Sequence, residues 1–182
     1  MIIILDTETT GLHPEDGDEL LQVSIIDYDK NVLFDRYIKP KFHSSWKEAE
    51  AVNHITPDMV RDAPTIDELR DELSVLINSA DIIIGYNTPY DLRFLDFCAD
   101  IRPTPGQKII DDMERFKEAF GFAKWIKLVE AADLLGYDWD GSGIAAHNSL
   151  GDVYATLHVH KKLNDFEQLK ELDADWRRRH GG

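Results

Sequence analysis

The sequence holds a single cysteine, is poor in basic residues and contains no long hydrophobic run. Because Cys98 has no second cysteine to pair with, an internal disulfide is excluded. No apolar stretch approaches the roughly 18 residues that a membrane-spanning helix needs. The chain also does not open with the basic and then apolar segments of a secretory signal. We therefore expect a cytoplasmic protein with no membrane partner.

The shortage of basic residues leaves the chain strongly negative. Lysine and arginine number 20 against 35 aspartate and glutamate residues, so the formal net charge is −15. A protein that holds long nucleic acid directly by its phosphates is usually basic. Two explanations of the acidity stay open. The acids keep the protein soluble, or some of them bind cations that in turn contact phosphate.

The chain does contain enough apolar sequence for one folded domain, since hydrophobic residues make up 43% of its 182 residues. Strands are expected at 2–9, 20–28, 32–38, 81–86 and 109–110, the first three forming a meander with short linkers. Helices are expected after Thr65, from Pro89, and near 112–120, 125–135, 149–164 and 165–176. Residues 40–65, which hold three prolines, are expected to be irregular. Strands that later alternate with helices predict an α/β fold, with a mixed sheet and helices on its faces. The strand order is not predicted.

Two carboxylates end the first predicted strand, in the segment DTETTGL. Side chains two residues apart on a strand point to the same side, so the carboxylates of Asp6 and Glu8 should lie on one side of the strand. Like charges held that close raise each other's pKa, and a divalent cation such as Mg²⁺ or Mn²⁺ relieves the repulsion. The spacing alone leaves a second explanation open, a solvated acid pair at a strand end.

Two further acids and a histidine follow later in the chain. Asp91 comes just after a buried strand, in the first turn of a predicted helix, where an acid also suits the helix dipole. Asp152 follows Ser149 in a pattern typical of a helix cap. His147 precedes that helix, and it can reach the same point as Asp152 only if it lies in the loop before the cap.

Four segments, DTETTGL, NHIT, YNTPYDLRFL and HNSLGD, occur in an order that resembles the DEDD exonuclease superfamily, in its histidine-type branch. That branch includes the epsilon subunit of bacterial DNA polymerase III and TREX-type exonucleases. The resemblance covers about residues 2–162. It implies a ribonuclease H-like α/β fold, with a five-stranded mixed sheet flanked by helices. It also implies 3′→5′ hydrolysis of nucleic acid to nucleoside 5′-monophosphates. The expected partners are single-stranded or frayed 3′ ends of DNA or RNA; we favour DNA, although no motif in the sequence distinguishes the two.

The resemblance also assigns roles to residues. It implies two Mg²⁺ or Mn²⁺ ions held by Asp6, Glu8, Asp91 and Asp152. His147 matches the general base, a role that suits its ordinary pKa of about 6.5. The expected domain is 1–164, followed by a helical tail at 165–182 that packs on it or binds a partner. A polymerase partner is conceivable but not favoured. A non-catalytic binding module on the same fold, and another ribonuclease H-like enzyme such as an endonuclease, are the alternatives.

The resemblance supports five substrate-binding positions more weakly: Thr9, Thr10, Leu12, Asn87 and Tyr90. Leu12 matches an apolar wedge beside the terminal base, or else packs after a glycine turn. Asn87 bonds its loop or approaches the substrate, and the Tyr90 hydroxyl contacts the scissile phosphate or the ring simply packs. His54 departs from the family pattern, because glycine is frequent at its position.

Overall fold

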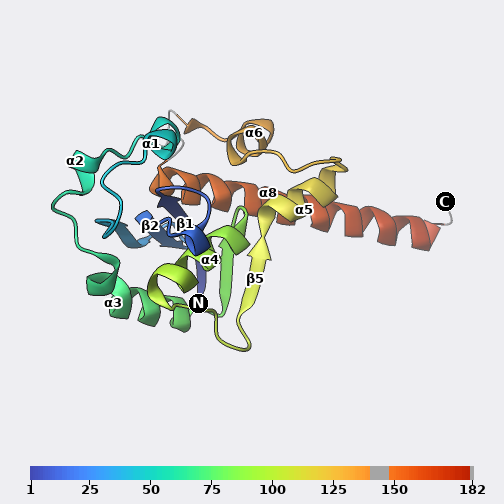
Figure 1. The fold of residues 1–182 in the computed structure, drawn as a ribbon. Coiled ribbons are helices and arrows are strands. Elements are labelled where there is room, and N and C mark those ends of the chain that lie inside the picture. Colours follow the sequence, from blue (N-terminus) through green and yellow to red (C-terminus); the bar gives the residue numbers. More distant parts are fainter. Residues whose placement is uncertain (140–147, 181–182) are drawn as a thin grey trace.

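The computed structural model describes residues 1–139 and 148–180, with side chains up to residue 168 and at residue 170. Its centre is a five-stranded sheet in the order β3-β2-β1-β4-β5 (Figure 1). The strands are β1 (Ile2–Thr9), β2 (Leu20–Asp27), β3 (Val32–Tyr37), β4 (Ile82–Gly85) and β5 (Lys108–Asp111). β1 pairs antiparallel with β2 and parallel with β4, and β4 pairs parallel with β5. The predicted meander and mixed sheet are confirmed.

Two layers of helices cover the sheet. The helical elements are η1 (Pro14–Asp16), α1 (Lys47–Asn53), α2 (Pro57–Val60), α3 (Ile66–Ser79), α4 (Thr88–Ala99), α5 (Asp112–Phe120), α6 (Leu128–Leu134) and α8 (Ser149–His180). α3 and α4 cover one face, where Ile3 and Leu5 of β1 are fully buried. α8 covers the other face, where Ile4 packs with Val153 and Leu157. The alternation of β1 therefore gives its odd residues to one layer and its even residues to the other.

The expectation that residues 40–65 are irregular is wrong, because α1 and α2 lie within them. Pro57 is the first residue of α2, where its missing N–H has no intrahelical acceptor to lose. Thr56 caps this helix by accepting from the Met59 N–H. The segment is anchored by Trp46, which is 5% exposed and whose indole N–H donates to the Ile55 carbonyl. Of the three prolines here, Pro57 begins a helix, and Pro40 and Pro64 lie in loops.

The last element, α8, runs without a break from Ser149 to His180. Its first half lies across the sheet, α5 and α6 pack against it, and its second half extends away from the domain (Figure 1). The stacking of Phe166 on Phe120, with ring centroids 4.9 Å apart, continues the packed part past residue 164. The predicted division into a domain at 1–164 and a tail at 165–182 stays a prediction. Within residues 1–139 and 148–180, no helix is both long and apolar enough to cross a membrane.

Candidate active site

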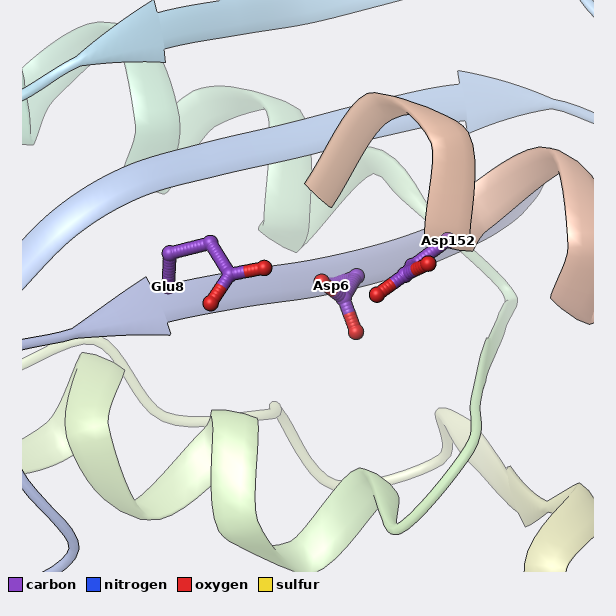
Figure 2. A group of neighbouring side chains, drawn as sticks. All are labelled: Asp6, Glu8 and Asp152. Carbon is purple, nitrogen blue, oxygen red and sulfur yellow. The ribbon is translucent and has the colours of Figure 1, made fainter. Parts of the chain in front are cut away.

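The acid pair of β1 lies on the face of the sheet that α8 covers. Asp6 and Glu8 follow Ile4 in the alternation, so their side chains leave the strand on the same side (Figure 2). The prediction that both carboxylates face one way is confirmed. The buried run Ile3–Leu5 fixes the strand in the middle of the sheet. The two charged side chains are therefore held by a rigid central strand.

The first turn of α8 adds a third carboxylate, that of Asp152. Ligand oxygens of Asp6, Glu8 and Asp152 all lie within 4.8 Å of one another (Figure 2). The predicted cap residue is wrong by one position: Asn148 caps α8, since its side-chain oxygen accepts from the Leu150 N–H and its carbonyl accepts from the Asp152 N–H. Ser149 is instead fully buried and its hydroxyl bonds that of Ser24 on β2. This contact ties the start of α8 to the sheet and so positions Asp152.

Asp91 approaches the cluster from the opposite layer of helices. It lies in the first turn of α4, 3% exposed, and the Thr7 hydroxyl donates to its Oδ1 at 2.7 Å. Thr7 points to the α4 side of β1, between the two acids that point to the α8 side. The strand thus holds two acids directly and orients a third through the Thr7 hydroxyl.

Burial and the neighbouring acids raise the pKa values of both carboxyl groups of β1. Burial is the largest cause that raises the pKa of Asp6 well above its ordinary value, and the charges of Asp91, Asp152 and Glu8 raise it further. Burial likewise raises the pKa of Glu8 to about 8, with Asp152 and Asp91 adding to the effect and a hydrogen bond from Asn53 opposing it. These groups do not all stay ionised at neutral pH without a compensating charge.

Burial also raises the pKa of Asp91, to about 7, although the hydrogen bonds from Thr7 act in the opposite direction. The donor set of the cluster consists of carboxylate oxygens alone, which are the ligands that Mg²⁺ and Mn²⁺ prefer. The absence of a thiolate or imidazole in the described cluster makes it a poor structural zinc site. The residues present therefore fit a hard divalent cation.

Beside the acids lies a cavity of about 570 Å³ that includes four of the five predicted substrate positions, Thr9, Thr10, Leu12 and Tyr90. Leu12 is 65% exposed, so the packing alternative for this residue is wrong. The Tyr90 hydroxyl lies 2.7 Å from the Thr9 hydroxyl and donates to the Gly11 carbonyl at 2.9 Å. Tyr90 therefore holds the loop that presents Leu12.

The opposite wall of this cavity comes from α1, which sequence reasoning missed. Glu48, Ala49, Val52 and Asn53 line it, and the Asn53 side chain donates to the Thr9 carbonyl at 3.1 Å. Val52 is 55% exposed. The apolar spacing of Ala49 and Val52, together with the helix-forming Lys, Glu and Ala residues of KEAEAVN, was the signal in the sequence for this helix.

Two non-glycine residues near the site adopt left-handed backbone conformations. His54 ends α1 with φ of 60°, a left-handed conformation that glycine adopts at the lowest cost. Asn87 precedes α4 with φ of 73°, and its backbone N–H donates to the Asp111 side chain at 2.8 Å. Asparagine tolerates this conformation better than most residues. His147, the predicted general base, lies outside the described residues.

A comparison with known protein families identifies the family to which this chain belongs. The family model RNase_T, described as Exonuclease, matches residues 3–160, which is most of the chain. The chain belongs to this exonuclease family. The match confirms the resemblance to the DEDD 3′→5′ exonucleases that act on nucleic acid. The matched range spans Asp6, Glu8, Asp91 and Asp152, whose roles stay a prediction. The histidine-type branch stays a prediction.

Individual relatives of this exonuclease agree with the family match. The DNA polymerase III subunit epsilon of Rickettsia typhi is 33% identical over 178 residues, which cover 91% of this chain and 75% of the relative. RNA exonuclease 4 of Candida glabrata is 27% identical over 172 residues, covering 91% and 61% respectively. A solved structure of exonuclease X in complex with 5′ overhanging duplex DNA superposes with a TM-score of 0.70 at 20% identity, covering 91% and 92%. The predicted ribonuclease H-like fold is confirmed.

Proposed function

We propose that this exonuclease removes nucleoside 5′-monophosphates from single-stranded or frayed 3′ ends, with DNA favoured, by a two-metal mechanism at the acid cluster. The observation that carries the proposal is the meeting of Asp6, Glu8 and Asp152 within 4.8 Å, where burial and the neighbouring carboxylates raise the pKa values of Asp6 and Glu8. Such a cluster is unfavourable unless a cation neutralises it. A phosphodiester bound there would share the same cation.

The chain's own side chains then divide the work. The three clustered acids and Asp91 would hold two Mg²⁺ or Mn²⁺ ions, which when bound stabilise the attacking and leaving oxygens of an in-line displacement. Thr7 keeps Asp91 in place by donating to its carboxylate. His147 would accept the proton of the attacking water, as the resemblance implies and as its ordinary pKa allows. The role of His147 rests on the sequence alone.

The cavity beside the acids would hold the terminal nucleotide. Leu12 and Val52, both largely exposed, offer apolar surfaces to a base. Thr9 and Thr10 line the same cavity as Glu8, with the Tyr90 hydroxyl bonded to that of Thr9. We favour DNA because the chain is similar to polymerase epsilon subunits. The chain is also similar to RNA exonuclease 4, so a test of substrate preference must include RNA. A polymerase partner is not favoured.

The decisive experiment is a time course on 5′-labelled oligonucleotides, with matched DNA and RNA sequences, in Mg²⁺, Mn²⁺ and EDTA. The proposal expects a ladder that shortens from the 3′ end, mononucleotide products, and no reaction in EDTA. Closed circular DNA should stay intact, which excludes an endonuclease. A folded protein that binds the oligonucleotides but never cleaves them in either metal would instead be a binding module, and the proposal would be wrong.

A further inference from the structure

The connection between α5 and α6 presents a group of aromatic rings to solvent, well separated in sequence from the acid motifs. Phe120 is 41% exposed, Phe122 is 39% exposed and Trp125 is 60% exposed. All three lie in the short segment FGFAKW. Scattered exposed apolar residues need no explanation, but a contiguous group of large ones marks an interaction surface.

These rings are exposed, yet they are held in place. The Trp125 indole N–H donates to the Glu114 carboxylate, and the Lys117 ammonium lies over the same ring, 5.2 Å from its centroid. Phe120 stacks on Phe166 of α8 at 4.9 Å. Because the side chains are already ordered, binding a flat partner to them loses little conformational entropy.

The same segment is positively charged in an acidic protein. Residues 117–127 contain three lysines and one glutamate, whereas the whole chain carries −15. The Lys117 ammonium donates to Glu114 at 2.7 Å and is partly neutralised. Lys124 and Lys127 are both exposed to solvent. Exposed rings with interleaved cations are the pattern by which proteins bind single-stranded nucleic acid without reading its sequence.

A hydrogen bond fastens this surface to the end of β4, the strand that pairs with β1 in the sheet. The Tyr86 hydroxyl donates to the Ile126 carbonyl at 3.0 Å. Tyr86 directly follows β4 and precedes Asn87, at the start of the helix that carries Asp91. The segment therefore has a fixed position relative to the acid cluster. A single strand of nucleic acid whose 3′ end lies at that cluster could extend over this segment.

We propose that Phe120, Phe122 and Trp125, with Lys124 and Lys127, form a stacking platform for the single strand on the 5′ side of the nucleotide being removed. The proposal rests on the proposed function, since the acid cluster sets where the 3′ end lies. Stacking uses the faces of the bases and not the 2′-hydroxyl. DNA and RNA strands of equal length should therefore depend on the platform equally.

The test measures binding separately from hydrolysis. In an Asp6→Asn background, fluorescence anisotropy would follow a 5′-fluorescein trinucleotide, a long oligothymidylate and a long oligouridylate. Trp125→Ala should weaken binding of both long strands about 5- to 100-fold, the usual effect of removing one ring on which a base stacks. The trinucleotide, which occupies the acid site, should bind unchanged. Phe42→Ala is the matched control, because Phe42 is 86% exposed in the loop that follows β3.

The lysines give a second readout. In Lys124→Ala/Lys127→Ala, the slope of log affinity against log salt for the long strands should fall by about 0.7 for each phosphate that the lysines no longer neutralise. If Trp125→Ala and Phe42→Ala bind the long oligonucleotides with equal affinity, the proposal that these rings bind nucleic acid is wrong. The surface would then be assigned to a protein partner. An equal weakening for the trinucleotide would also overturn the proposal. Failure of the proposed function is a different result, in which the wild-type protein with Mg²⁺ leaves oligonucleotides uncut.

Discussion

Replacing Glu8 with glutamine should stabilise the metal-free protein. The pKa of Glu8 is raised to about 8 from an ordinary value of 4.5, so the folded state binds this proton more tightly than the unfolded state does. Linkage then requires that the contribution of Glu8 to stability falls as the pH rises above 4.5, and stops falling above about 8. Glutamine keeps an oxygen that can accept from Asn53 and removes the charge.

The magnitude follows from the shift. Each pH unit between the two pKa values changes the free energy of unfolding by about 1.4 kcal/mol. At pH 7 the glutamine variant should therefore gain up to about 3 kcal/mol, with coupling to the neighbouring acids and solvent screening reducing this figure. For a chain of this size, that gain corresponds to an increase in Tm of at most about 6–12 °C.

The assay is thermal unfolding in EDTA, followed by circular dichroism, at pH 4.5, 7 and 8. The difference between Glu8→Gln and wild type should grow with pH and vanish near pH 4.5. Glu72→Gln, an exposed change on α3 with the same effect on net charge, is the control. Added Mg²⁺ should raise the Tm of wild type more than that of the variant. If Glu8→Gln melts no higher than Glu72→Gln at pH 8, the carboxylates do not strain the folded state.

The remaining predictions concern catalysis and the loop beside the site. EDTA should abolish hydrolysis and Mg²⁺ or Mn²⁺ should restore it, since the described donor set is all carboxylate; full activity in chelator would contradict a metal mechanism. Asp152→Asn should remove nearly all turnover while the circular dichroism spectrum stays native. His147→Ala should lower the rate about 10²- to 10⁴-fold and alter the acid limb of the pH profile; an unchanged profile would make His147 a structural residue. Tyr90→Phe, which removes the hydrogen bonds to Thr9 and Gly11, should cost about 0.5–1.5 kcal/mol of stability and raise KM more than it lowers kcat.

The sequence predicted best what depends on local pattern. The alternation of β1 was enough to place Asp6 and Glu8 on one side, because a strand has only two faces. The helical spacing after Thr65 predicted α3, and its capping partner Glu68 does accept from the Thr65 N–H. These features need no knowledge of how distant segments meet.

Features that depend on distant contacts were not predictable in the same way. The position of β1 between β2 and β4 follows from pairings across about 80 residues, such as Ile3 with Ile83. The wall that α1 adds to the nucleotide cavity was missed because prolines at 40, 57 and 64 suggested an irregular segment. The cap of α8 differed by one residue because Ser149 found a buried partner on β2. In each case a tertiary contact decided between local alternatives.

The central place of β1 also orders events when the chain folds. β1, β2 and β3 are neighbours in sequence and can pair early, whereas α8 brings Asp152 to the strand from near the other end of the chain. We therefore expect α8 to dock after this meander has formed, so that the repulsion between Asp6 and Asp152 opposes the docking step and not the earlier pairing. A divalent cation that needs both groups should accordingly slow unfolding much more than it speeds folding.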